Sequence, residues 1–125
     1  MIDKTILIID DMKHIRDMLW SEFKQEGYRP ILADTGQNGL NYLFAKENRV
    51  DLVILDIMMP KMNGFQVLEK IRTSNDSVSQ IPVIMLTGNH EKDNVIKGLS
   101  RGANEYVLKP YKFLDVLARV KKYIG

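Results

Sequence analysis

The sequence predicts an α/β domain with a five-stranded parallel sheet and five helices that cover both faces of the sheet. Two observations predict this fold: five short runs are rich in Ile, Val and Leu, and helical apolar patterns alternate with them. The chain has 125 residues, of which 45% are apolar and 27% charged, which suits one globular domain with its own core. Parallel strands need crossover connections, and helices supply them here.

Each apolar run has the length and composition of a strand buried on both faces. The five runs are TILII (5–9), RPILA (29–33), DLVIL (51–55), PVIML (82–86) and EYVL (105–108).

Five other segments carry an apolar stripe with the three- and four-residue spacing of a helix. The stripes are Ile15, Leu19 and Phe23; Leu40, Leu43 and Phe44; Phe65, Leu68 and Ile71; Val95, Ile96 and Leu99; and Phe113, Val116, Leu117, Val120 and Ile124. Gly27, Gly102 and the polar stretch 73–80 are predicted to end helices or return the chain to the sheet.

Charge and composition exclude several classes of protein. A net charge of +2 is too small to indicate direct nucleic-acid binding. The absence of cysteine excludes disulfides and cysteine-ligated metals. No stretch approaches the roughly 20 apolar residues of a membrane span. We therefore expect a cytoplasmic protein without membrane insertion.

Carboxylates follow two of the predicted strands. Asp10 and Asp11 come after the first strand, and Asp56 comes after the third. In a sheet of order 2-1-3-4-5 these strands are neighbours, so the carboxylates lie together at the carboxyl edge, where open α/β sheets bind ligands. Two such charges about 5 Å apart repel by roughly 3 kcal/mol, which raises a pKa or recruits a cation. Mg²⁺ is suited to such oxygen ligands, and Asp56 becomes a candidate nucleophile.

The fourth and fifth strands also end in polar residues. Thr87 offers a hydroxyl and Lys109 an ammonium, and Pro110 after the lysine allows a cis peptide bond. Carboxylates, a hydroxyl and a lysine at one edge of a sheet suit the binding of a phosphoryl group.

Four motifs in order give a resemblance to a known family. They are IIDD (8–11), DIMMPKMNG (56–64), TG (87–88) and KP (109–110). Each motif alone is common, but the ordered set resembles the receiver domains of bacterial two-component response regulators, of the chemotaxis-type single-domain kind. The resemblance covers essentially the whole chain. It implies a flavodoxin-like fold of receiver type and one receiver domain over residues 1–125 with no output domain.

The resemblance also implies a reaction and a metal site. A histidine kinase or a histidine phosphotransfer protein would donate a phosphoryl group from phosphohistidine to Asp56, with Mg²⁺ present. By matching positions, Asp10, Asp11, Asp56 and the main-chain carbonyl of Met58 would bind Mg²⁺. Such a domain signals rather than turning over a substrate, since it catalyses only its own aspartyl phosphorylation and dephosphorylation.

The remaining matched residues imply a switch. Thr87 and Lys109 would contact the phosphoryl group, and Tyr106 matches the switch aromatic of the family. Movement of Thr87 would let Tyr106 turn inward and alter the face formed by helix four, strand five and helix five. A downstream protein would bind this face, and a phosphorylation-dependent homodimer is left open. Gly88 stands where many relatives have alanine, so access to the site would be freer here.

Two other functions would use parts of the same pattern. A phosphatase with an aspartate nucleophile would use similar Mg²⁺ chemistry, but it generally needs an acidic residue where Met58 stands, and the chain has no room for a substrate cap. An inert interaction module would have the fold without phosphorylation. At residue level, Asp10 and Asp11 could instead cap the first helix.

Other conspicuous residues have simpler interpretations. His14 and His90 are predicted to lie on the surface, and Trp20 to pack at the edge of the first helix. Met58, Met59 and Met62 are predicted to pack in a loop rather than bind a metal through sulfur. Several basic residues make either a partner-binding surface or an ordinary solvated one: Lys92, Lys97, Arg101, Lys112, Lys121 and Lys122.

Overall fold

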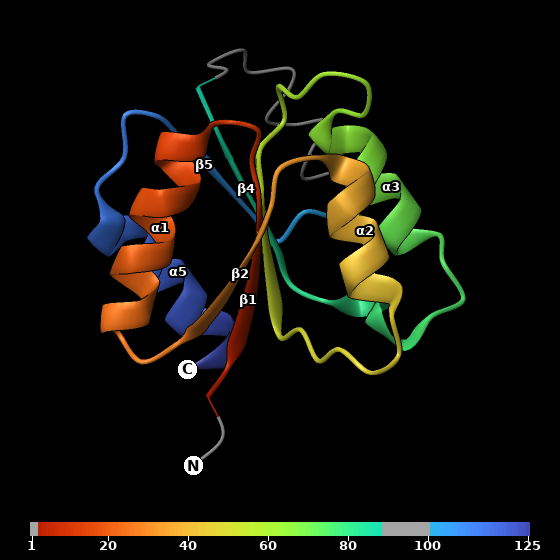
Figure 1. Cartoon of the computed structure of the whole chain (residues 1–125), viewed down its shortest axis with the longest axis horizontal. Coiled ribbons are helices and arrows are strands. Elements are labelled where there is room, and N and C mark those ends of the chain that lie inside the picture. The colour runs from red at the N-terminus through yellow and green to blue at the C-terminus, as the bar shows by residue number, and fades with distance from the viewer. Residues whose placement is uncertain (1–2, 89–100) are drawn as a thin grey trace.

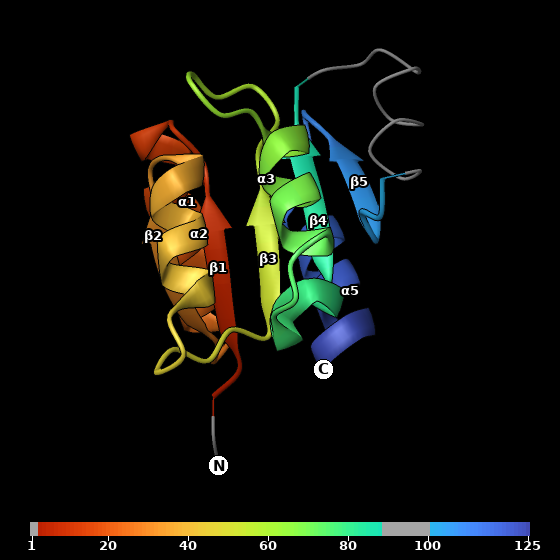
Figure 2. The same ribbon diagram turned by 90° about the vertical axis from the view of Figure 1, so that its right-hand side faces the viewer.

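A parallel five-stranded sheet with the order β2-β1-β3-β4-β5 forms the centre of the fold, as Figure 2 shows. The structure is a computed structural model that describes residues 3–88 and 101–125. The strands are β1 (Thr5–Ile9), β2 (Arg29–Ala33), β3 (Leu52–Leu55), β4 (Val83–Thr87) and β5 (Glu105–Leu108). The predicted fold class and strand order are confirmed.

Helices cover both faces of the sheet (Figure 1). On one face lie α1 (Lys13–Gln25) and α5 (Phe113–Ile124), and on the other lie α2 (Gly36–Phe44) and α3 (Gly64–Arg72). The predicted stripe of Val95, Ile96 and Leu99 lies outside the described residues. The polar stretch after α3 contains a short 3₁₀ helix, η1 (Ser77–Gln80), which the sequence analysis did not predict.

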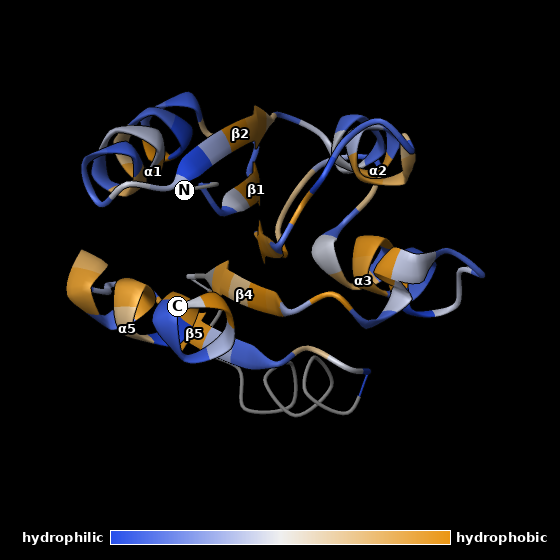
Figure 3. Ribbon diagram, turned by 90° about the horizontal axis from the view of Figure 1, so that it is seen from below, coloured by the Kyte–Doolittle hydropathy of each residue, from blue (hydrophilic) through white to orange (hydrophobic). Residues whose placement is uncertain are grey.

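Side chains that alternate along each central strand fill two separate cores, one on each side of the sheet. Ile6 and Ile8 of β1 pack in the core beneath α1 and α5, whereas Leu7 and Ile9 pack in the core beneath α2 and α3. Each such side chain contributes about 1.5–3 kcal/mol through burial. Figure 3 shows the two helical layers on either side of the sheet, with apolar colour along β4 and on parts of β1 and β2.

The prediction that all five strands are buried on both faces is wrong for the two outer ones. β1 and β3 are buried along their whole length, but Arg29 of β2 is exposed, and Ile31 and Leu32 are half-buried. In β5, Val107 is buried, while its other residues are half-buried. The reason is position, because β2 and β5 form the two edges of the sheet.

Local signals explain where the helices begin and end. Gly27 follows α1 with a φ of +90°, a left-handed conformation that favours glycine, so its prediction as a helix stop is confirmed. The Thr35 hydroxyl accepts a hydrogen bond from the Asn38 amide and caps α2. Asn63 and Gln66 form a reciprocal capping box at the start of α3. That box fixes the chain just after the loop that follows Asp56.

Candidate phosphoryl and metal site

Asp10 and Asp56 follow directly after neighbouring strands and stand at the same level of the sheet. In the parallel pairing of β1 with β3, Ile9 is opposite Leu55, the residue before Asp56. The Asp56 amide donates to the Ile9 carbonyl at 3.0 Å, and the Asp10 amide donates to the Ala33 carbonyl at 3.1 Å. Backbone hydrogen bonding therefore continues one residue beyond β1 and β3, and it fixes the backbone positions of Asp10 and Asp56.

The carboxylates of Asp10, Asp11 and Asp56 form an acidic cluster, with one oxygen of each within 4.8 Å of the others. Asp10 is 3% exposed and Asp56 5% exposed, while Asp11 is exposed. Three oxygen donors of like charge at this spacing fit a hard divalent cation such as Mg²⁺. The strand order predicted from the sequence brings these residues together as expected.

The alternative role of the first two carboxylates, capping α1, is not what the structure has. The N-cap residue of α1 is Met12, whose side chain makes no capping hydrogen bond. The Asp10 carboxylate accepts a hydrogen bond from the Met12 amide at 2.9 Å, one position before the helix begins. The turn that precedes α1 therefore holds the Asp10 side chain in place, and its carboxylate remains part of the acidic cluster.

Burial and like charges shift the titration of the acidic cluster. Burial is the largest cause that raises the pKa of Asp56 from 3.8 to about 6, and the charge of Asp10 is the next. Lys109 and a hydrogen bond with the Met58 backbone oppose this rise. The pKa of Asp10 is also raised, mainly by burial. A cation would relieve the same repulsion without protonating the carboxylates.

The loop after Asp56 is folded tightly against it. The amides of Met59 and Gly64 both donate to the Ile57 carbonyl, at 3.0 Å and 2.9 Å. A Cβ placed on Gly64 would lie 2.4 Å from the Asp56 carbonyl oxygen and 2.8 Å from the Ile57 Cα. The glycine that ends DIMMPKMNG is therefore needed because α3 starts against the peptide that carries Asp56. In the sequence this glycine ends the motif, but no local pattern there indicates the close contact.

The predicted burial of the loop methionines and of two other conspicuous residues is confirmed only in part. Met59 is buried and Met62 packs against the core, so their predicted packing is confirmed. Met58 is 66% exposed, so the prediction that it packs in the loop is wrong. Trp20 of α1 is 43% exposed and belongs to neither core. The backbone of Met58 forms a hydrogen bond with the Asp56 carboxylate, while its side chain is exposed. His14 is exposed as predicted, and His90 lies outside the described residues.

β4 and β5 bring the other predicted site residues to the same edge of the sheet. Thr87 of β4 pairs with Leu108, the residue before Lys109. The Thr87 side chain lies outside the described part of the structure. The Lys109–Pro110 peptide bond is cis, as the sequence allows. Burial raises the pKa of both Asp10 and Asp56, and the charge of Lys109 opposes this rise. A Cβ on Gly88 would lie 3.9 Å from the Lys109 Cδ, which is ordinary van der Waals contact.

Two residues near the acidic cluster were missed as site residues in the sequence. Arg16 of α1 donates to the Asp10 carbonyl at 2.9 Å, and its charge opposes the rise that burial causes in the pKa of Asp10. Tyr111 is the second, because burial and then the charges of Asp10 and Asp56 raise its pKa. The one signal for Tyr111 was its place directly after the Lys-Pro pair, and nothing in the local pattern indicated Arg16.

Tyr106, the predicted switch aromatic, has its hydroxyl buried in this structure. Its ring packs against the core beneath α2 and α3, and within the described residues its hydroxyl has no hydrogen-bond partner. Burial, and then the charge of Asp56, raise its pKa. Tyr106 is thus connected electrostatically to the acidic cluster from the middle of β5.

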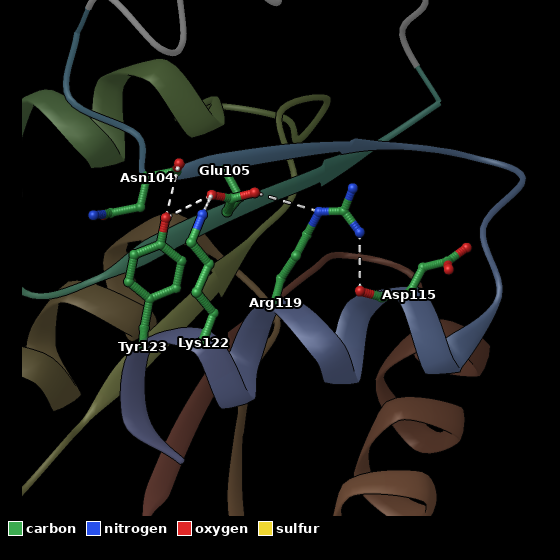
Figure 4. Close-up of polar contacts among 6 residues, drawn as sticks. All are labelled: Asn104, Glu105, Asp115, Arg119, Lys122 and Tyr123. Carbon is green, nitrogen blue, oxygen red and sulfur yellow. Dashed lines mark hydrogen bonds and ion pairs between the residues drawn. The ribbon is translucent and has the colours of Figure 1, made fainter.

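A polar group on the outer side of β5 and α5, here called the β5–α5 surface, consists of Glu105, Arg119, Lys122 and Tyr123 (Figure 4). The Tyr123 hydroxyl donates to Glu105 Oε2 at 2.5 Å, and Lys122 Nζ lies 3.3 Å from the same oxygen. Arg119 Nε lies 3.4 Å from Glu105 Oε1. These contacts lower the pKa of Glu105, chiefly through the Tyr123 hydrogen bond.

Of the other basic residues singled out in the sequence, Arg101, Lys112 and Lys121 are exposed. Lys92 and Lys97 lie outside the described residues. The Arg101 guanidinium lies 6.0 Å from the centre of the Phe65 ring. This contact ties Arg101 to α3, and a partner-binding role for the basic residues stays a prediction.

The sequence model of the response regulator receiver domain matches residues 6–121. The chain belongs to this family. The match includes every residue that the sequence analysis placed at the site, from Asp10 to Lys109. The protein is therefore a receiver domain of the two-component response regulators, a signalling module, and the predicted family resemblance is confirmed.

Curated relatives and solved structures agree with this assignment. The transcriptional regulatory protein HprR of Escherichia coli is 39% identical over 93% of this chain and 49% of its own length. The phosphate regulon regulatory protein PhoB of Pseudomonas aeruginosa is 36% identical over 97% of this chain and 52% of its own. The chain thus spans about half the length of the curated relatives it matches.

Two solved structures are similar over nearly the whole chain. The chemotaxis protein CheY4 of Vibrio cholerae has a TM-score of 0.87 at 27% identity, covering 98% of this chain and 100% of that one. The response regulator TrrA of Thermotoga maritima, solved in complex with Mg²⁺ and BeF, has a TM-score of 0.84 at 34% identity, covering 97% of this chain and 99% of that one.

In the described part of this chain, no helix has the length and apolarity to cross a membrane.

Proposed function

We propose that Asp56 accepts a phosphoryl group from a phosphohistidine of a histidine kinase or histidine phosphotransfer protein. The observation that carries this proposal is the acidic cluster, in which a buried carboxylate at the end of β3 lies within 4.8 Å of two others. Such a charge is costly unless it has a counter-ion or a chemical task. Family membership supports the task of phosphoryl acceptor.

Mg²⁺ fits the donor set, which consists of oxygens at one edge of the sheet. Asp10, Asp11, Asp56 and the main-chain carbonyl of Met58 would hold it. When bound, it neutralises charge on the phosphoryl oxygens and screens the carboxylates from one another. The TrrA structure with Mg²⁺ and BeF shows that a relative with 34% identity binds this ion together with BeF.

The residues of this chain then have distinct tasks in the transfer. A carboxylate oxygen of Asp56 forms a bond to phosphorus while the bond from phosphorus to the donor imidazole nitrogen breaks, and the departing imidazole takes a proton. Asp56 must be ionised to attack, and a pKa of about 6 leaves most of it ionised at pH 7 and above. Lys109 would neutralise the phosphoryl oxygens, and Thr87 would donate a hydrogen bond to one of them.

Phosphorylation would be transmitted to a partner through β5 and α5. The new negative charge and acceptor oxygens would draw Thr87 and Lys109 toward Asp56. Tyr106, whose ring lies between β5 and the α2–α3 core, would change its packing and bias the face formed by helix four, β5 and α5. A downstream protein, or a second copy of the domain in a phosphorylation-dependent homodimer, would bind this face.

The test is intact mass after incubation with Mg²⁺ and acetyl phosphate. The native protein should gain one phosphoryl adduct, which prior chelation of Mg²⁺ prevents. Asp56→Asn should gain none. Asp34→Asn is the matched control, since Asp34 follows β2 at the same edge of the sheet but is exposed and lies outside the acidic cluster. This control should be labelled like the native protein.

Other outcomes would favour the rival functions. An adduct on Asp56→Asn would place the acceptor elsewhere. A folded native protein that neither binds Mg²⁺ nor gains an adduct would be an inert interaction module. Steady hydrolysis of a phosphate ester by catalytic amounts of protein would identify a phosphatase instead.

A further inference from the structure

Tyr111 has a buried hydroxyl in the loop between β5 and α5, two residues after Lys109. Its ring packs against the core beneath α1 and α5. Lys109 follows β5 at the carboxyl edge of the sheet, the edge at which Asp10 follows β1 and Asp56 follows β3, so the loop that carries Tyr111 begins beside the acidic cluster. The hydroxyl oxygen is inaccessible to solvent, and the described residues offer it no hydrogen-bond partner. Phenylalanine would supply the same apolar packing, so packing alone does not account for the hydroxyl.

The surroundings of this hydroxyl are acidic. Burial and then the charges of Asp10 and Asp56 raise the pKa of Tyr111 to about 12, so the group stays protonated at neutral pH. For Tyr106, the other tyrosine with a buried and unpartnered hydroxyl, Asp56 is the charge that raises the pKa, without Asp10. Tyr111 is therefore a hydrogen-bond donor in the field of both buried carboxylates of the acidic cluster.

A buried donor without an acceptor destabilises the fold, whereas the same donor stabilises any state in which an acceptor comes within reach. The acidic cluster supplies acceptors of the right charge. Carboxylates that hold a metal are usually fixed by hydrogen bonds to the oxygens that the metal leaves free. No other described side chain combines a buried, unpaired donor with the field of both Asp10 and Asp56.

We propose that Tyr111 is a positioning residue of the Mg²⁺ site, whose buried hydroxyl donates a hydrogen bond to the Asp10 side of the acidic cluster, directly or through one water, once Mg²⁺ is held. This inference rests on the proposed function, in which Asp10 and Asp56 hold Mg²⁺. It adds to that function a residue outside the ligand set, from the loop that joins β5 to α5.

The experiment is a titration with Mg²⁺ alone at pH 8, followed by the amide NMR signals of the loop after β3, on the native protein and Tyr111→Phe. We expect Tyr111→Phe to bind Mg²⁺ about tenfold more weakly, the lower end of the effect of losing an outer partner of a metal ligand. Without Mg²⁺, its melting temperature should equal or exceed that of the native protein, because an unpaired buried hydroxyl has been removed.

Tyr28→Phe is the matched control, since it also removes a tyrosine hydroxyl beside the core beneath α1 and α5. Tyr28 precedes β2 at the opposite edge of the sheet, and the charge that raises its pKa after burial is Glu26 rather than Asp10 or Asp56. The Mg²⁺ affinity of this variant should stay within about twofold of the native value, which is less than 0.5 kcal/mol.

Each remaining outcome overturns the inference. Equal Mg²⁺ affinity of the native protein and Tyr111→Phe would refute the role of Tyr111 and leave the Mg²⁺ site intact. An equal loss in both variants would show a general effect of hydroxyl removal. A lower melting temperature of Tyr111→Phe without Mg²⁺ would show that the hydroxyl is paired inside the native fold. Failure of the native protein to bind Mg²⁺ would refute the site and this inference together.

Discussion

The acidic cluster and the β5–α5 surface place carboxylates in opposite electrostatic environments within one small domain. In the acidic cluster, three carboxylates lie together, and two of them are almost completely buried. On the β5–α5 surface, the single carboxylate of Glu105 receives contacts from three side chains of α5, two of them basic. The pKa of Asp56 is raised, and that of Glu105 is lowered.

This difference in electrostatic environment distinguishes a site that needs a bound cation from a site whose charges are neutralised by the chain itself. Glu105 is stabilised in its charged form by residues of the same chain, so it needs no ligand. Asp56 is destabilised in its charged form, and the chain offers it the opposing charge of Lys109 and one backbone hydrogen bond. A cluster that the fold leaves electrostatically unfavourable is a better candidate for function than one that the fold neutralises.

The largest expected effect comes from displacing the backbone behind Asp56. Gly64→Ala places a Cβ 2.4 Å from the Asp56 carbonyl oxygen, and neither this backbone nor α3 can move without disturbing the acidic cluster. We expect a loss of about 2–4 kcal/mol in the free energy of unfolding, as for severe overpacking. Urea denaturation followed by circular dichroism measures it. Unchanged stability would show that the loop after Asp56 is held less tightly than in this structure.

Removing the charge of Asp56 should instead stabilise the protein when no divalent cation is present. A pKa raised from 3.8 to about 6 corresponds to about 3 kcal/mol against the ionised form in the folded state. We therefore expect Asp56→Asn to be about 1–3 kcal/mol more stable than the native protein at pH 7.5 in the presence of a chelator. Urea denaturation at pH 4 and pH 7.5 is the measurement.

The pH dependence of this effect has a definite sign. Because the folded pKa of Asp56 lies above the unfolded one, the folded state binds more protons between pH 3.8 and about 6. The stability contributed by protonation is complete below that window and is lost as pH rises through it. The advantage of Asp56→Asn should thus be large at pH 7.5 and small at pH 4. A variant less stable than the native protein at pH 7.5 would contradict the raised pKa.

A change on the β5–α5 surface should give the opposite sign. Glu105 is 21% exposed, and Glu105→Gln removes the charge that Arg119 and Lys122 contact while keeping the shape of the side chain. We expect a loss of about 1 kcal/mol at pH 7, within the range for partly exposed ionic hydrogen bonds. Denaturation of both proteins at pH 7 and pH 3 tests this.

The lowered pKa of Glu105 fixes the pH window of that effect. Its stability is present above the unfolded value of 4.5 and is lost as pH falls through the lower, folded value. The difference between Glu105→Gln and the native protein should therefore shrink at pH 3. Asp34→Asn serves as a comparison for a carboxylate without basic contacts. The pKa of Asp34 is also lowered, but chiefly by a hydrogen bond from the neutral Asn38 side chain.

The sequence predicted the fold and the grouping of the carboxylates for one physical reason. In a parallel sheet, residues that follow neighbouring strands must meet at one edge, so Asp10 and Asp56 could be placed together from strand order alone. The same reasoning failed for the burial of β2 and β5, because run composition does not distinguish a central strand from an edge strand that a helix partly covers.

Residues whose role depends on how one element docks against another could not be predicted in this way. Arg16 reaches the Asp10 carbonyl from α1, and Tyr111 lies in the field of Asp10 from a loop about a hundred residues later. The close approach of Gly64 to the Asp56 peptide depends on how α3 docks after its capping box. Each requires three-dimensional packing that no local pattern encodes.

The smallest expected effect separates the two glycines at the edge of the sheet. A Cβ on Gly88 would meet the Lys109 Cδ at 3.9 Å, an ordinary contact with a flexible side chain, and Gly88 has no left-handed φ that alanine would strain. Gly88→Ala should therefore change the free energy of unfolding by less than about 0.5 kcal/mol, as most surface substitutions do. Measured beside Gly64→Ala under the same conditions, it controls for the added methyl group. A loss as large as that of Gly64→Ala would mean that the edge as a whole tolerates no added volume, and the rigid support of Asp56 could no longer be assigned to the start of α3.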